Sequence, residues 1–212
     1  MSPSPARDRI LQRIKQALGQ QRDYNGAEFR RLLESAPAAH RDLAEISNPG
    51  QVFMQQATAA GARLLEINSA SEVPAWLRAS EMAKHPVTLS SQDTVQSLDW
   101  SGLQITDDYR GEARVGVVYA HAAAAETGTL MQHSHAVPSG LLYLVDTLIV
   151  LLNRADIRPR YEDLWADGPQ GSAAGTPRAI HLITGPSRTA DVEQTIQVGA
   201  HGPRELYIVV LG

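Results

Sequence analysis

TLIVLL, residues 147–152, is the segment that decides the fold class of this 212-residue chain. Five consecutive apolar residues follow Thr147, and LYIVVL, residues 206–211, has a similar composition. A strand with one face in water alternates apolar and polar side chains, whereas a strand covered on both faces does not. We therefore predict that both segments are central strands of a sheet that is covered on both sides.

Patterns typical of helices and strands alternate through the rest of the chain. Asn48-Pro49 has the composition of a helix start, with a capping side chain followed by proline at the first helical position, and this helix should end at Gly61. A strand is expected over residues 64–67. Further candidates are residues 71–79, 87–89, 93–98, 103–106, 114–119 and 159–168. This alternation predicts a three-layer α/β fold with a mainly parallel sheet.

Residues 1–40 are predicted to form a helical arm that precedes an α/β domain of residues 41–212. Apolar residues recur at helical spacing from Ile10 to Leu18, and Gly19 follows as a stop. Residues 1–41 hold seven Arg and one Lys against four acidic residues, while the whole chain has a net charge of −4. The functional interpretation of this arm is a docking element for a protein partner or for a second copy of the chain. The alternative is an ordinary solvated helix face.

Composition excludes several classes of function. The chain contains no cysteine, so it forms no disulfide and holds no zinc or iron–sulfur cluster through its own thiolates. The basic arm lacks the aromatic residues and clustered charge of a nucleic-acid-binding face. No apolar run approaches the roughly 20 residues of a membrane span, and the N-terminal segment lacks an apolar signal core. We predict a cytoplasmic protein with no membrane span and no nucleic-acid partner.

HLITGPSRTADVEQTIQVGAHGP, residues 181–203, concentrates residues that suit an anion site. Its first residues continue an apolar strand, which Gly185-Pro186 should end. The residues that follow are good helix starters, so we predict a helix that ends at Gly199, with Asp191 and Glu193 supporting its first turn. Free N–H groups at that start, together with Arg188, would bind a carboxylate or a phosphate. The alternative is a plain strand-to-helix turn with Arg188 in a surface ion pair.

AETGTL, residues 125–130, is the second candidate segment. Glu126 is the only acid between Glu112 and Asp146, and four alanines at residues 122–125 leave room for a ligand. The carboxylate would act as a base, a nucleophile or a cation partner. The alternative is a tight hairpin with Glu126 in solvent. The residues that we predict to bind the ligand are Thr127, Gly128, Thr129, Gly185, Ser187, Arg188, Thr189, His201 and Gly202.

Three histidines are further candidate site residues. His133 and His135 are two residues apart, so on a strand they would share a face and begin a metal site. No third ligand follows at a fixed spacing, and we therefore predict no metal. His201 lies in the tight AHGP turn, where its ring would contact the ligand or bond to the backbone.

AETGTL and GPSRTADVEQTIQVGAHGP, in this order and followed by a final strand, together resemble the LUD domain family, and specifically its lactate utilization protein C type. The resemblance extends over about residues 113–211, although residues 131–150 depart from the usual pattern. It implies a fold of the ribose-phosphate isomerase and CoA-transferase class. It also implies a role beside two iron–sulfur proteins in the oxidation of L-lactate to pyruvate. Related CoA-transferases form an acyl intermediate on a glutamate that Glu126 resembles, and this analogy implies a catalytic role for Glu126.

The functional hypothesis is therefore a cluster-free component of an iron–sulfur L-lactate oxidation system, with iron–sulfur proteins as partners and a small anionic ligand. Its pocket is expected where the ETGT corner, residues 126–129, meets the GPSRT loop, residues 185–189, at strand ends. One alternative is a stand-alone enzyme acting on a small phosphorylated or CoA-linked substrate, and another is a non-catalytic scaffold. The sequence identifies no cofactor, and it leaves open whether this chain alone is an enzyme.

Overall fold

The computed structural model describes residues 9–13, 16, 45–111, 113–135, 137–165, 177–190, 196–198 and 202–212. The chain divides into one unit of residues 1–44 and a second unit of residues 45–212. In the first unit, residues 9–13 and 16 are helical, as the spacing from Ile10 predicts. None of the helices in the described ranges is long and apolar enough to cross a membrane.

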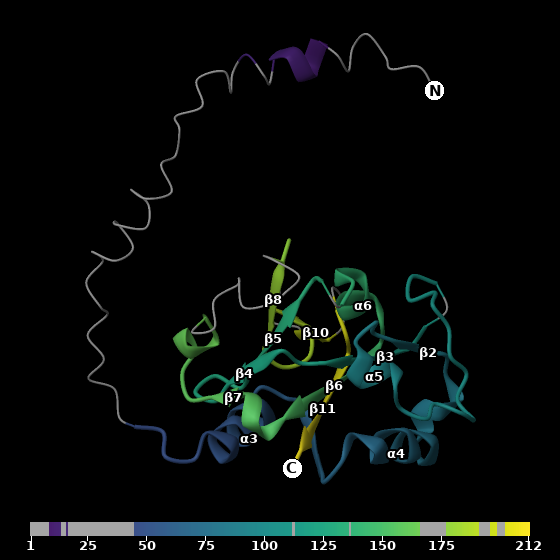
Figure 1. Ribbon diagram of the computed structural model, residues 1–212, viewed down its shortest axis with the longest axis vertical. Coiled ribbons are helices and arrows are strands. Elements are labelled where there is room, and N and C mark those ends of the chain that lie inside the picture. The colour runs from purple at the N-terminus through teal and green to yellow at the C-terminus, as the bar shows by residue number, and fades with distance from the viewer. Residues whose placement is uncertain are drawn as a thin grey trace. The chain divides into compact units, whose positions relative to one another are not determined.

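A five-stranded parallel sheet forms the centre of the second unit (Figure 1). Its strands, in spatial order, are β1 (Arg63–Ile67), β11 (Glu205–Leu211), β6 (Thr147–Asn153), β3 (Val115–Tyr119) and β2 (Val87–Leu89). Every neighbouring pair runs parallel. The predicted α/β class is therefore confirmed, and the two strands without polar alternation, β6 and β11, are inner strands of this sheet.

Successive side chains of β6 enter two different hydrophobic cores. Leu148, Val150 and Leu152 belong to the core on one face, and Ile149 and Leu151 belong to the core on the other. All five are fully buried. Burial on both faces leaves no position where a polar side chain would be favoured, which explains the uninterrupted apolar run.

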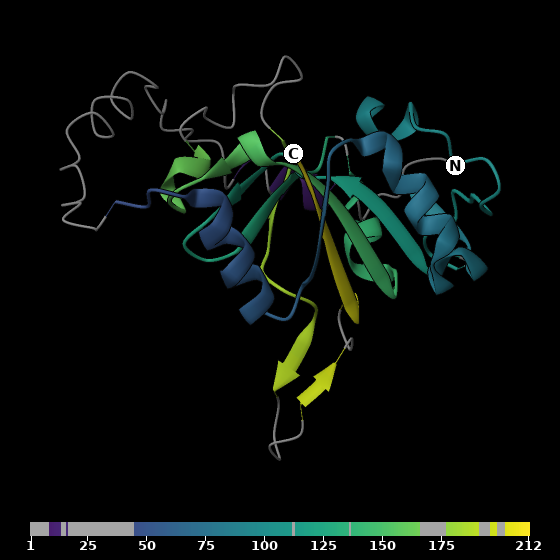
Figure 2. The same cartoon turned by 90° about the horizontal axis from the view of Figure 1, so that it is seen from below.

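Helices and a second sheet cover the two faces of this sheet. The first face packs against α3 (Pro49–Ala59), α6 (Ser139–Leu144) and the second sheet, and the opposite face packs against α4 (Val73–Ala79) and α5 (Asp93–Gln96). Figure 2 shows α3 and α4 on opposite sides of the strands. The remaining short helical turns are η1 (Ala70–Glu72), η2 (Glu81–Lys84), η3 (Arg154–Asp156) and η4 (Glu162–Trp165).

The start of α3 follows from its sequence. The Asn48 side chain accepts a hydrogen bond of 3.2 Å from the Gln51 N–H, and Pro49 is the first helical residue. Proline is well placed there because its missing N–H would have no partner inside the helix. The chain leaves the helix through Gly61, which has a φ of 95°. The predicted helix between Asn48 and Gly61 is confirmed.

A second, mixed sheet was not predicted. Its order is β7 (Ile157–Arg158), β4 (Ala122–Ala124), β5 (Thr129–His133) and β8 (Ile180–Ile183). The β4–β5 and β5–β8 pairs are antiparallel, whereas β4 and β7 are parallel. Alanine is a weak strand former, so the composition of β4 does not reveal a sheet. The expected strand at residues 103–106 is wrong, since only an isolated bridge joins Ile105 to Val87 there.

The predicted helix after the GPSRT loop is also wrong. Strands β9 (Arg188–Ala190) and β10 (Ile196–Val198) pair antiparallel in its place, and Figure 2 shows this hairpin extending from the body. β-Branched residues in both segments favour extended backbone, and residues that cap helices also favour turns between strands. Asp191 and Glu193 lie outside the described residues, and the helix that they were expected to start is replaced by the hairpin.

Candidate functional site

A chain of threonine hydroxyls joins the two segments that the sequence singles out. Thr127 Oγ1 lies 2.7 Å from Thr129 Oγ1, which in turn lies 2.7 Å from Thr184 Oγ1. The antiparallel pairing of β5 with β8 produces this contact, because it sets Leu130 opposite Ile183. The structure therefore brings the ETGT corner beside the residue that precedes the GPSRT loop.

Two glycines allow both segments to dock against the last turn of α3. Gly128 has a φ of 65°, and a Cβ atom there would overlap the backbone of Ala57. Gly185 has a φ of 73°, and its Cβ would overlap the carbonyl oxygen of Ala60. Only glycine combines a left-handed backbone with such a close approach. These two glycines therefore contribute close backbone packing at the site.

Arg188 lies at the same end of α3. Its guanidinium packs against Gly61, where any side chain would collide with it. The carboxyl end of a helix carries partial negative charge, so a cation is favoured there. Arg188 is exposed, and its neighbour Ser187 donates its backbone N–H to the Pro203 carbonyl oxygen at 2.9 Å. The GPSRT loop is thereby fastened both to α3 and to the loop before β11.

A cavity of about 260 Å³ lies behind this loop. Leu142, Leu148 and Leu206 contribute apolar surface, and Tyr143, Ser187 and Arg188 contribute polar groups. Among the described residues that line it, Arg188 is the only cation and none is a carboxylate. Leu148 and Leu206 are the second residues of β6 and β11, so the cavity lies at the amino ends of the central strands.

Glu126 lies neither in solvent nor in the lining of this cavity. Its carboxylate accepts a hydrogen bond of 2.9 Å from the Arg160 guanidinium and one of 2.6 Å from the backbone N–H of Tyr161. The side chains of Glu126 and Arg160 are only 23% and 19% exposed. AETGTL forms a hairpin between β4 and β5, as the alternative interpretation has it, but Glu126 pairs with a cation that follows β7.

Three side chains that the sequence did not indicate form a hydrogen-bonded group beside the cavity. Ser139 Oγ lies 2.8 Å from His181 Nε2, and Tyr143 Oη lies 2.8 Å from His181 Nδ1. Burial lowers the pKa of His181, which keeps its imidazole neutral at neutral pH. Ser139 and Tyr143 are four residues apart and so share a face of α6. Ser139 and Tyr143 are about 40 residues away from His181 in the sequence, so no short sequence motif reveals this group.

His133, one of the two histidines considered as metal ligands, lies beside a third histidine, His121. The rings of His133 and His121 lie 3.8 Å apart between centroids. Burial, followed by the nearby His121 and His135, lowers the pKa of His133 to about 4. In the part of the chain that the structure describes, no group of three or more metal-binding side chains is placed to hold an ion.

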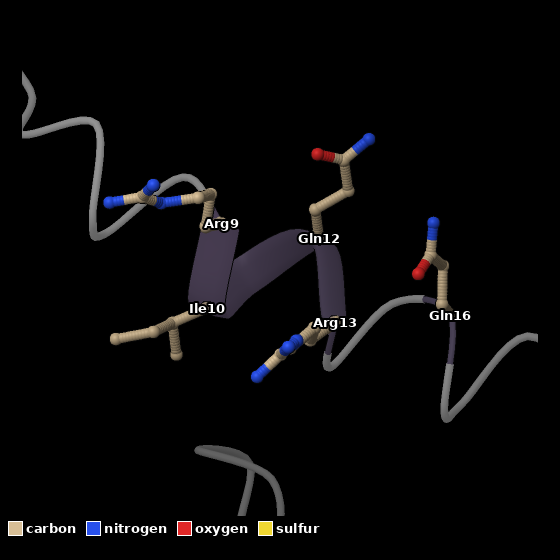
Figure 3. A pocket seen from close by; sticks show the side chains of 5 residues that line it. All are labelled: Arg9, Ile10, Gln12, Arg13 and Gln16. Atoms are coloured by element: carbon tan, nitrogen blue, oxygen red, sulfur yellow. The ribbon is translucent and has the colours of Figure 1, made fainter.

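A hollow lies along the described part of the helical segment in the first unit. Figure 3 shows Arg9, Gln12 and Gln16 pointing to one side of this segment and Ile10 and Arg13 pointing to the other. Ile10 is 59% exposed. These five described side chains all come from one short stretch, so none of them forms a wall opposite the others.

Comparison with known proteins places the second unit in a family. Residues 50–211 match the model of the LUD domain, from α3 to β11. The chain belongs to the LUD domain family. A crystal structure of a DUF162 family protein from Deinococcus radiodurans matches the LUD domain of this chain with a TM-score of 0.61 at 17% identity, covering 80% of this chain and all of that one. The fold is therefore shared with a solved structure.

Relatives of this LUD domain include two proteins named lactate utilization protein C. Lactate utilization protein C of a Geobacillus strain is 35% identical over 107 residues, which are 49% of this chain and 44% of that protein. Its namesake from Bacillus subtilis is 34% identical over 103 residues, or 47% and 43%. An uncharacterized Neisseria meningitidis protein is 28% identical over 193 residues, or 88% and 79%. The matches to the two lactate utilization proteins thus span less than half of their lengths.

The predicted site residues fall into separate places in this LUD domain. The cavity is lined by Gly185, Ser187, Arg188 and Gly202, whereas Thr127, Gly128 and Thr129 form the adjoining corner, Thr189 lies in β9, and His201 lies outside the described residues. The structure therefore concentrates the candidate site on the GPSRT loop, with Tyr143 as a wall residue that the sequence did not indicate.

Proposed function

We propose that this protein is a component of a system that oxidises L-lactate to pyruvate, and that it binds a small carboxylate in the cavity behind the GPSRT loop. Membership of the LUD domain family and the similarity to two lactate utilization proteins support the link to lactate. The oxidation itself, the iron–sulfur partners and a cytoplasmic location belong to the proposal.

The observation that carries this proposal is the chemistry of the cavity wall. Arg188 supplies a planar cation that can form two parallel hydrogen bonds with a carboxylate, and Ser187 lies next to it with a hydroxyl group. Buried leucines form part of the lining, and no described lining residue would repel an anion. Pockets for drug-sized ligands measure about 300–1,000 Å³, so about 260 Å³ suits a small molecule.

Electron transfer in this proposal belongs to partner proteins. The sequence has no cysteine, and iron–sulfur clusters are held mainly by cysteine thiolates. The chain would therefore present the carboxylate to a partner that holds the cluster. Glu126 would act as an orienting residue, because its carboxylate fixes Arg160 and the backbone at Tyr161. The catalytic role that the resemblance implies would require this ion pair to open.

Reconstitution tests the proposal directly. The purified chain should be colourless, free of iron and inactive on L-lactate, and addition of co-purified iron–sulfur partners should restore oxidation. Arg188→Ala should lower the restored rate while leaving the partners bound. Turnover of lactate by the pure chain would overturn the accessory role. Tight binding of a phosphorylated or CoA-linked compound, with none of lactate, would favour a stand-alone enzyme.

A further inference from the structure

Tyr143 connects the cavity with two side chains behind it. Its ring lines the cavity, and its hydroxyl group bonds to Nδ1 of His181 at 2.8 Å. The other ring nitrogen of His181 bonds to Ser139 Oγ, also at 2.8 Å. We call these three residues the Tyr143–His181–Ser139 relay. It joins α6 to β8, and both nitrogens of the imidazole have a partner in it.

A neutral imidazole carries one N–H group and one lone pair. The half-buried His181 has a lowered pKa because burial disfavours its charged form. Serine and tyrosine hydroxyls can each donate or accept a hydrogen bond. The relay therefore has two complete arrangements, which differ only in the positions of its protons and have the same charge.

The two arrangements give Tyr143 opposite properties at the cavity. When the Tyr143 hydroxyl donates to Nδ1, the Nε2–H group donates to Ser139, and the phenol oxygen offers lone pairs to a ligand. When the Nδ1–H group donates to Tyr143, Ser139 donates to Nε2, and the phenol O–H is available to a ligand. The same side chain thus accepts a hydrogen bond from a hydroxyl group or donates one to a carbonyl oxygen.

Tyr143 and the GPSRT loop face the same small space. If Gly202 carried a Cβ atom, that atom would lie 3.0 Å from Ser187 Cβ and 4.0 Å from Tyr143 Cδ1. Arg188 follows Ser187 and also lines the cavity. Ser187 and the Tyr143 ring therefore border the same part of the cavity.

We propose that the cavity selects small carboxylates that carry an oxygen on the adjacent carbon, whether that oxygen is a hydroxyl or a carbonyl. Arg188 binds the carboxylate, and Tyr143 bonds to the adjacent oxygen. His181 and Ser139 are positioning residues, which allow the phenol to donate or to accept without a change of charge. The inference rests on the proposed carboxylate site and adds the group that recognises the second oxygen.

The test compares three ligands of equal carbon number on the full-length chain. L-lactate and pyruvate carry the adjacent oxygen, whereas propionate lacks it and serves as the matched ligand control. Titrations followed by NMR should show about tenfold tighter binding of lactate and of pyruvate than of propionate, which is the upper range for one neutral hydrogen bond. Tyr143→Phe should reduce the affinities for lactate and for pyruvate to that for propionate. The affinity for propionate should stay unchanged.

Two variants of His181 test the positioning role. His181→Leu should lose most of the preference over propionate, because the phenol has no partner behind it. His181→Asn should retain part of it, because an amide can present either an oxygen or an N–H group. A merely structural role for His181 would weaken propionate binding to the same degree. Circular dichroism of each variant checks that it folds.

The outcomes separate this inference from the proposed function. Arg188→Ala should weaken the binding of all three ligands, since each has a carboxylate. If the wild type binds propionate as tightly as lactate and pyruvate, or if Tyr143→Phe keeps the preference, the relay has no recognition role while the carboxylate site stands. If the wild type binds none of the three, the carboxylate site and the relay are both refuted.

Discussion

Gly185→Ala should destabilise the LUD domain more than the same substitution at an ordinary positive-φ glycine. At Gly185, alanine would have to keep a φ of 73° and its methyl group would overlap the carbonyl oxygen of Ala60. A left-handed backbone costs about 1–2 kcal/mol for an L-residue. Overpacking against a rigid neighbour adds about 1–3 kcal/mol. The free energy of unfolding should therefore fall by about 2–5 kcal/mol, out of roughly 5–15 kcal/mol for a typical domain.

Gly102→Ala is the matched control. Gly102 also has a positive φ, of 79°, but the nearest atom to its Cβ would be Arg78 Cδ at 3.4 Å, on a flexible side chain. Gly102→Ala should lower the free energy of unfolding only by the backbone contribution of about 1–2 kcal/mol. Alanine restricts the unfolded chain equally at both positions, so that contribution cancels in the comparison.

Urea unfolding measures both variants, with fluorescence of the buried Trp100 as one probe of the core. The difference between the two variants reports the packing of the GPSRT loop on α3. Gly185 also lines the cavity, so its variant should bind lactate more weakly, whereas Gly102→Ala should bind it normally. Equal losses of stability at the two positions would refute the docking of this loop on the end of α3.

Three further predictions address charged groups. Glu126→Gln should lower the free energy of unfolding by about 1–2 kcal/mol in urea titrations, because the partly buried pair with Arg160 loses its charge-assisted hydrogen bond. Loss of partner-dependent lactate oxidation without that destabilisation would instead support a chemical role for Glu126. Arg188→Lys should weaken lactate binding by about 10- to 100-fold, almost as much as Arg188→Ala, because an ammonium group cannot form the paired hydrogen bonds. Calorimetry measures the affinity, and a lysine variant with wild-type affinity would contradict this prediction. The pKa of His133 is lowered from 6.5 to about 4, so the unfolded chain binds a proton that the folded chain does not, and stability should fall as the pH drops from 6.5 toward 4. His133→Asn should flatten this part of the pH profile, and an unchanged slope would speak against the lowered pKa.

The sequence indicates those parts of the fold that depend on local pattern. The unbroken apolar runs of β6 and β11 reflect burial on both faces, and Asn48-Pro49 starts α3 through local backbone chemistry. The sequence pattern does not predict the second sheet, because its β4 strand is three alanines that are stabilised by partners elsewhere in the chain. Serine, threonine and aspartate suit a helix start and a turn equally well, so the sequence pattern predicts a helix where the structure has the β9–β10 hairpin.

The candidate site also combines residues from one local stretch of sequence with residues that only the tertiary packing brings together. The GPSRT loop was recognisable because glycine, proline and arginine are concentrated in one stretch of sequence. Tyr143, His181 and Ser139 were not, since their hydrogen bonds arise only when α6 packs beside β8. The sequence also does not predict the ion pair of Glu126 with Arg160. The two residues are 34 positions apart, and the pairing of β4 with β7 brings them together.

The direction of β11 has a practical consequence for experiments. The strand begins at Glu205 near the cavity and runs for seven residues to Leu211. At about 3.3 Å per residue, its far end lies roughly 20 Å from the candidate site. A fluorophore or an immobilisation tag attached after Gly212 would therefore emerge at the opposite edge of the sheet and leave the mouth of the cavity open to added ligand.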